Sequence, residues 1–134
     1  PASSSQANER VKANKFFTLE DDALLQEWYG RVWMNHPFSR SNNILFVKKL
    51  AESYRRGQVQ EACCITFAST SEKWFHPLLD FPQCFIHTRV NYLLPDGKIK
   101  KGVTKGSVVT YLGNNLKGFH ENFKELGVVK IKVT

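Results

Sequence analysis

Cysteine, histidine and long apolar runs are all scarce in this chain of 134 residues. Its three cysteines (Cys63, Cys64 and Cys84) are too few for a disulfide framework and lack the spacing of a metal site, which predicts buried free thiols in a reducing compartment. The four histidines show no metal-ligand spacing, so we expect no bound metal. No apolar stretch reaches the roughly 20 residues that cross a bilayer, and no signal peptide is visible. These features predict a cytoplasmic protein without a membrane partner.

Acidic residues are also in the minority. There are 12 Asp and Glu against 19 Lys and Arg, which gives a formal net charge of +7. A basic balance favours a polyanion partner, of which nucleic acid is the commonest, although an ordinary basic protein has the same charge. Positive side chains concentrate in a central stretch that contains Lys98, Lys100, Lys101 and Lys105. A flexible basic loop can follow a phosphate backbone, so this stretch is the best candidate for contact with DNA.

The pattern of apolar residues predicts one α/β domain over residues 1–134, with residues 1–14 as a loop or frayed start. Strands are expected at 31–35, 62–67, 83–94, 107–112 and 128–133, with a turn at 95–98. Helices are expected at 42–56, 72–79 and 116–126, and apolar positions such as Leu45, Phe46 and Leu50 should face the core in the first of them. This order predicts a sheet with helices on both faces. Ligands of such sheets bind where strands end at their carboxyl edge.

The tetrad Asn35-His36-Pro37-Phe38 follows the first expected strand and precedes a polar turn that opens a helix. At this position a side-chain oxygen of Asn35 and the backbone carbonyl of His36 can together orient an amino group for methyl transfer. Pro37 would stiffen the turn, and Phe38 would stack on a base that has been flipped out of a duplex. An Asn-x-Pro-Phe sequence also occurs by chance in ordinary turns.

Several motifs, in the same order along the chain, resemble the phage-type DNA N6-adenine methyltransferases. The matching segments are 17–24, 30–39, 70–76, 89–92 and 102–107, followed by Tyr111-Leu112-Gly113. The family has proline at the position of His36. It also has an upstream strand that ends in an aspartate just before the segment that here begins Pro1-Ala2-Ser3-Ser4, and that strand is not in this sequence.

The resemblance implies a Rossmann-like methyltransferase fold, incomplete at the N-terminus, with S-adenosylmethionine as cofactor and DNA as partner in a phage or prophage setting. Position by position, it assigns the tetrad (Asn35, His36, Pro37 and Phe38) to catalysis. It assigns contact with the methyl donor to Phe17, Thr18, Asp21 and Asp22. It assigns Trp74, Lys105 and Ser107 to the neighbourhood of the DNA, although tryptophans such as Trp28, Trp33 and Trp74 are core residues by default. Ser39 and Arg40 after the tetrad, and Lys100 and Lys101 in the basic stretch, are further candidates for contact with DNA.

Three hypotheses follow from the sequence. The first is a site-specific DNA methyltransferase that transfers a methyl group from S-adenosylmethionine to N6 of adenine. The second is a catalytically inactive, methyltransferase-like DNA-binding module with an incomplete donor pocket. The third is a structural component that binds neither ligand. Affinity for S-adenosylmethionine separates the first hypothesis from the second, and salt-dependent DNA binding separates the second from the third.

Overall fold

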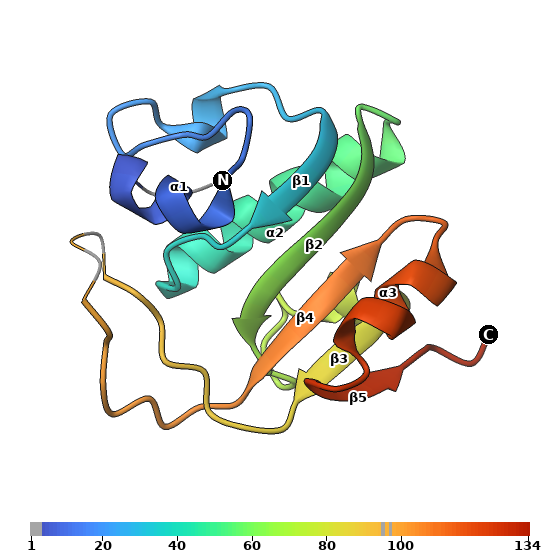
Figure 1. Cartoon of the computed structure of the whole chain (residues 1–134). Helices are drawn as coiled ribbons and strands as arrows, with labels where there is room; N and C mark the ends of the chain where they lie inside the picture. The colour runs from blue at the N-terminus through green and yellow to red at the C-terminus, as the bar shows by residue number, and fades with distance from the viewer. Residues whose placement is uncertain (1–3, 95, 97) are drawn as a thin grey trace.

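The computed structural model describes residues 4–94, 96 and 98–134, and these form a five-stranded sheet with helices on both sides (Figure 1). Residues 95 and 97 of the expected turn at 95–98 lie outside the described residues. The strands are β1 (Gly30–Met34), β2 (Val59–Phe67), β3 (Gln83–Ile86), β4 (Ser107–Leu112) and β5 (Gly127–Lys130). The helices are α1 (Ser5–Val11), α2 (Arg40–Arg55) and α3 (Leu116–Phe123), with short 3₁₀ helices η1 (Ala23–Leu25) and η2 (His76–Asp80).

The sheet is mixed, and its strands lie in the order β1-β2-β4-β3-β5. β1 runs parallel to β2, whereas β4 is antiparallel to both β2 and β3, and β5 is antiparallel to β3. Met34 pairs with Cys64, and Phe67 pairs with Ser107. The residues that follow β1 and β2 and those that precede β4 therefore meet at one end of the sheet. The predicted α/β class is confirmed.

α2 covers one face of the sheet and begins where Ser39 caps it. The Ser39 hydroxyl oxygen accepts a hydrogen bond from the backbone N–H of Asn42 at 3.3 Å. Phe46 and Leu50 of this helix are buried in the core beneath the sheet. Leu45, which we predicted for the same face, is 50% exposed. The prediction was wrong because consecutive residues of an α-helix point about 100° apart around its axis. Since Phe46 faces the core, the preceding Leu45 is turned away from it.

α3 covers part of the opposite face. Its Phe119 stacks on Tyr111 of β4, with ring centroids 5.0 Å apart. The neighbours Cys63 and Cys64 point to opposite faces, as the alternation of a strand predicts: Cys64 lies in the α2-side core, and the half-buried Cys63 lies on the α3 side. All three cysteines are free thiols, and burial raises the pKa of Cys64 to about 12, so this thiol stays protonated at neutral pH.

Several predicted elements have other extents in the structure, and part of the N-terminal stretch expected as a loop or frayed start (1–14) forms helix α1 (Ser5–Val11). The helix expected at 72–79 is a series of turns followed by η2, because Pro77 lacks an N–H and disfavours helical backbone at the residue before it. The strand expected at 83–94 ends at Ile86, since its partner β4 begins at Ser107 and Phe85 already pairs with Val108. The residues after Ile86 therefore leave the sheet. The last strand, expected at 128–133, is Gly127–Lys130.

Candidate functional site

The loop between β1 and α2 carries the tetrad at the end of the sheet where β1 and β2 finish. Solvent exposure alternates along the tetrad: Asn35 and Pro37 are exposed, whereas His36 is buried and Phe38 is half-buried. The buried ring of His36 thus anchors the loop between two residues that face solvent. The Asn35 side chain makes no hydrogen bond to any described residue, so its amide oxygen and nitrogen are both available to a ligand.

His36 belongs to the packing between β1 and α2. Its ring stacks on Phe46, with centroids 5.3 Å apart and planes inclined by 21°. Its Nε2 atom lies 2.6 Å from Oδ1 of Asn43 in the first turn of α2. Burial lowers the pKa of His36 to about 4, and the hydrogen bond with Asn43 opposes this shift without cancelling it. The ring is therefore neutral at pH 7.

Phe38 joins two other rings in an aromatic cluster of Phe38, Phe67 and Tyr92. Its centroid lies 4.9 Å from that of Phe67 at the end of β2 and 5.3 Å from that of Tyr92, and both contacts are edge-to-face. The Tyr92 hydroxyl lies 2.6 Å from the hydroxyl of Ser107, the first residue of β4. The cluster brings two distant segments of the chain to the tetrad, and the Tyr92 hydroxyl links it to the start of β4. No role at the site was predicted for Phe67 or Tyr92. The one feature that could have indicated a site role for Phe67 is its position at the end of the second parallel strand.

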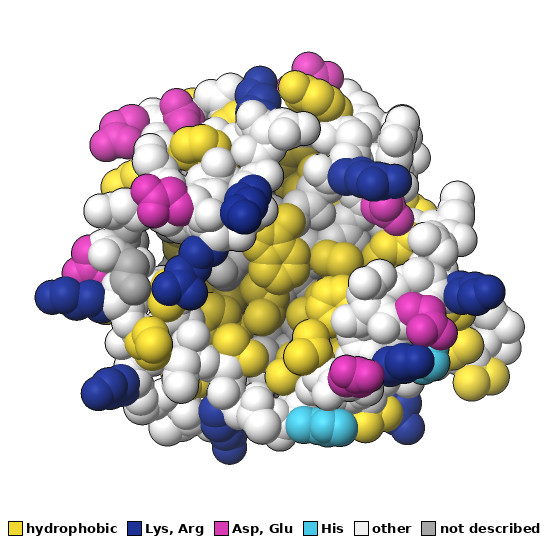
Figure 2. All heavy atoms as spheres, in the orientation of Figure 1, with side chains coloured by type: hydrophobic (Ala, Val, Ile, Leu, Met, Phe, Trp, Pro, Cys, Tyr) yellow, Lys and Arg dark blue, Asp and Glu magenta, His cyan; other side chains and the backbone are white. Residues whose placement is uncertain are grey.

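The segment at 87–106 places positive charge beside the aromatic cluster. The Lys105 ammonium lies 5.4 Å from the ring centre of Phe67. The backbone N–H of Lys100 donates to the carbonyl of Tyr92 at 2.7 Å, and the Lys100 and Lys101 side chains are exposed. Figure 2 shows Lys and Arg side chains at the rim of the molecule where this segment runs in Figure 1. Cations and aromatic rings thus meet at the same end of the sheet.

The other residues predicted to contact DNA divide into exposed and buried ones. Ser39 and Arg40 are exposed at the start of α2, directly after Phe38. Trp74 is only 9% exposed, and its ring meets that of Phe75 edge-on in the α2-side core. Ser107 is 2% exposed and faces Tyr92. The structure therefore brings Ser39 and Arg40 to the surface beside the tetrad and leaves Trp74 and Ser107 inside the protein.

The residues predicted to contact the methyl donor lie in the segment that precedes η1. Asp21 closes a turn there, because its carboxylate accepts hydrogen bonds from the N–H and the hydroxyl of Thr18 at 2.8 and 3.0 Å. These bonds lower the pKa of Asp21. Asp22 caps η1, where its carboxylate accepts a hydrogen bond from the backbone N–H of Leu24 at 3.2 Å. Phe17 is half-buried, and the Lys15 ammonium lies 5.7 Å from its ring centre. No hydrogen bond or ring contact within the described residues joins this turn to the tetrad.

A cleft of about 910 Å³ crosses the α3 side of the sheet, between the N-terminal segment and α3. Figure 2 shows apolar side chains at its floor. Trp33 and Cys63 lie on the strands beneath it, and Phe17 and Phe119 line it from the two sides. This volume is within the range of nucleotide and cofactor pockets.

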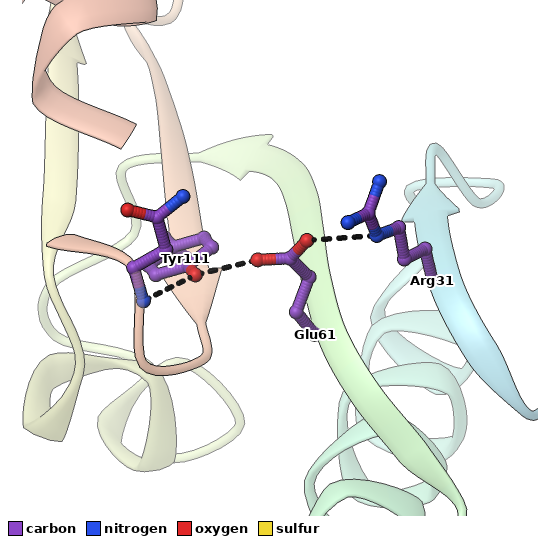
Figure 3. Close-up of polar contacts among 4 residues, drawn as sticks. Arg31, Glu61 and Tyr111 are labelled. Atoms are coloured by element: carbon purple, nitrogen blue, oxygen red, sulfur yellow. Dashed lines mark hydrogen bonds and ion pairs between the residues drawn. The ribbon is translucent and has the colours of Figure 1, made fainter. Parts of the chain in front are cut away.

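One side of the cleft is formed by a polar network across β1, β2 and β4 (Figure 3). The Nε atom of Arg31 lies 3.1 Å from one carboxylate oxygen of Glu61, and the Tyr111 hydroxyl donates to the other oxygen at 2.6 Å. Arg31 and Glu61 also pair in the sheet, near the starts of their strands. The network therefore lies at the end of the sheet opposite Asn35.

Two findings concern ligands and membranes. In the part of the chain that the structure describes, no group of three or more His, Cys, Asp and Glu side chains is placed to hold a metal ion. None of the described helices combines the length and the apolar character that a membrane span needs.

An exposed amide, an aromatic cluster and lysines thus lie together in an α/β protein at the carboxyl end of a parallel strand, the edge at which such sheets bind ligands. A scan against protein-family models matches residues 2–129, nearly the whole chain, to DNA N-6-adenine-methyltransferase (Dam). The chain belongs to this family, which confirms the resemblance that its motifs indicated. Searches of curated proteins and of solved structures found no match.

Proposed function

We propose that this protein is a site-specific DNA methyltransferase that transfers a methyl group from S-adenosylmethionine to N6 of adenine. The observation that carries the proposal is the position of Asn35, which is exposed and unpaired among the described residues, beside the aromatic cluster and the lysines of segment 87–106. These groups supply an acceptor for the amine, rings for a flipped base and cations for phosphates. The phage or prophage setting and the bacterial cytoplasm belong to the same proposal.

The exocyclic nitrogen of adenine is a poor nucleophile, because its lone pair is delocalised into the ring. In our proposal the Asn35 side-chain oxygen and the His36 carbonyl accept its two N–H groups and draw the nitrogen toward a tetrahedral shape. With the donor bound, a bond from N6 to the methyl carbon would form as the donor's carbon–sulfur bond breaks, and N6 would release one proton to solvent. S-adenosylmethionine supplies the electrophilic methyl group. Phe38 holds the base, and Pro37 stiffens the loop.

The chemistry of the N-terminal segment fits such a donor. Phe17 is a half-buried ring beside the cleft, where it can stack on a purine. Asp21 and Asp22 are exposed carboxylates that can accept hydrogen bonds from hydroxyl or amino groups, and Thr18 fixes the orientation of Asp21 before any ligand arrives. We assign the adenosine part of the donor to these four residues. β1, α2 and the parallel strand β2 are consistent with one unit of a Rossmann-like fold.

DNA would contact the exposed cations around the tetrad. Arg40, Lys100, Lys101 and Lys105 are exposed and can bind phosphates, and the exposed Ser39 directly precedes Arg40 at the start of α2. The buried Ser107 would contribute indirectly, through the hydrogen bond between its hydroxyl and that of Tyr92. Trp74 would likewise contribute from the core, by packing beneath the loop that follows β2. Phosphate contacts of this kind position the duplex without reading its sequence.

The decisive experiment measures transfer of a labelled methyl group from S-adenosylmethionine to adenine-containing DNA. We expect Asn35→Ala to lower the rate by about 100-fold or more, because one preorganised acceptor at the reacting atom is lost. Asn114→Ala is the matched control, since Asn114 is exposed and follows β4 at the opposite end of the sheet. Equal rates in the parent chain and Asn35→Ala would refute the assignment.

Titration of the folded chain with S-adenosylmethionine and, separately, with S-adenosylhomocysteine tests the donor site. Binding in the micromolar range supports an intact site, and Asp21→Asn should then weaken it. A folded chain that binds DNA with strong salt dependence but neither nucleoside would instead be a DNA-binding module.

A further inference from the structure

The proposed transfer uses only the backbone carbonyl of His36, although its side chain is among the most buried polar groups described, with 5% exposure. We infer that the His36 side chain is a positioning residue that holds the catalytic loop through Asn43. The catalytic consequence rests on the proposed function, whereas the hydrogen-bond chain behind it does not.

Asn43 connects His36 to the backbone of Phe38. Its Nδ2 donates to the carbonyl of Phe38 at 3.3 Å, and its Oδ1 lies 2.6 Å from Nε2 of His36. Because the amide nitrogen faces a carbonyl, the amide oxygen must face the histidine, and that oxygen can only accept. His36 therefore donates from Nε2, and its neutral ring has the Nε2–H tautomer. A flipped Asn43 amide would place its oxygen against the carbonyl of Phe38 and is excluded by repulsion.

Ring contacts add a second link between the same residues. The His36 ring lies between Phe46, on which it stacks, and Phe38, which it meets edge-on with centroids 5.1 Å apart. His36 thus contacts the Phe38 ring directly and holds the Phe38 carbonyl through Asn43, which is itself 6% exposed. Both the ring and the backbone of Phe38 are therefore located by one buried side chain.

The other ring nitrogen limits what His36 can do. Nδ1 is buried and has no hydrogen-bond partner among the described residues. A second proton on the ring would place an unsolvated charge in the protein interior, so burial keeps the ring neutral. Since Nδ1 is also inaccessible, the ring cannot take the proton that N6 releases. Its contribution is geometric.

Two substitutions separate this role from simple filling of space. His36→Gln keeps a side-chain donor that can reach Asn43, whereas His36→Leu fills the site without one. Ile44→Ala is the control on the same helix, because Ile44 is 48% exposed beside Asn43. We expect His36→Leu to lower kcat by about tenfold, as misplacement of a reacting group does, with KM for DNA unchanged. His36→Gln should recover most of kcat. A kcat in His36→Leu that equals that of His36→Gln would overturn the inference.

A second readout does not depend on activity. Nuclear magnetic resonance of the ring nitrogens should show a proton on Nε2 and none on Nδ1, and nuclear Overhauser contacts between Phe38 and Tyr92 should persist in His36→Gln and weaken in His36→Leu. A proton on Nδ1 of the neutral ring, or contacts that are equal in both variants, would overturn the inference. Absence of methyl transfer by the parent chain would refute the proposed function and leave this structural test in force.

Discussion

The hydroxyl of Tyr111 donates a 2.6 Å hydrogen bond to Glu61, and this bond joins the end of β4 to the start of β2. The same hydroxyl accepts from the backbone N–H of Asn115 at 2.8 Å. Arg31 extends the connection to β1 (Figure 3). Three neighbouring strands are thus linked at the end of the sheet that lies away from the tetrad, and we expect this network to stabilise the sheet.

Tyr111→Phe tests the value of this network. The substitution leaves a carboxylate oxygen of Glu61 and the N–H of Asn115 without their partner, and we expect a loss of about 1–2 kcal/mol in the free energy of unfolding. Urea denaturation measures the effect. Tyr29→Phe is the control, because Tyr29 is 57% exposed and its hydroxyl makes no hydrogen bond to a described residue. An unchanged midpoint in Tyr111→Phe would show that the network adds no net stability.

Gly127→Ala tests the close approach of β5 to β3. A Cβ atom at this position would lie 2.0 Å from the carbonyl oxygen of Phe85, and a backbone atom in a sheet cannot move aside easily. We expect a loss of about 2 kcal/mol or more, measured by denaturation. At Gly106, by contrast, a Cβ would meet no atom within 4 Å, so Gly106→Ala should be neutral or slightly stabilising. Equal stabilities of the two variants would contradict this account.

The pH dependence of stability tests the burial of His36. Burial lowers its pKa from 6.5 to about 4, so between these values the unfolded chain binds a proton that the folded chain does not. Stability should therefore decrease as the pH falls through this window, by about 1.4 kcal/mol per pH unit from this group, and its contribution should be constant above pH 6.5. Comparison with His36→Gln isolates the effect. Parallel pH profiles of the two proteins would show that the ring titrates normally.

The salt dependence of DNA binding tests the segment at 87–106. Replacing Lys100 and Lys101 together by Gln should reduce the slope of log K against log salt by about 2, because each phosphate contact contributes about 0.9. The double variant Lys117→Gln, Lys130→Gln is the control, because it removes the same number of positive charges from exposed lysines on α3 and β5. If both pairs alter the slope equally, the contribution of the segment is only its charge and not its position.

Much of the local structure could be read from neighbouring residues. The strand at 107–112 was predicted with its observed ends, and α2 (Arg40–Arg55) lies within two residues of the helix expected at 42–56. The tetrad was placed at a junction of strand and helix for the same reason. Apolar alternation, helix caps and turn residues are local signals that act over a few positions. They can therefore be recognised in the sequence alone.

Contacts between distant segments were decided by the tertiary structure. The point where β3 ends depends on how far β4 extends beside it, and the meeting of Tyr92 and Phe67 with Phe38 depends on that departure from the sheet. Likewise, the sequence identified His36 as the unusual member of the tetrad, but only packing of β1 against α2 buries its ring and pairs it with Asn43. Residue type and order specified the chemistry available at the loop. Long-range packing selected which of those groups face a ligand and which hold the others in place.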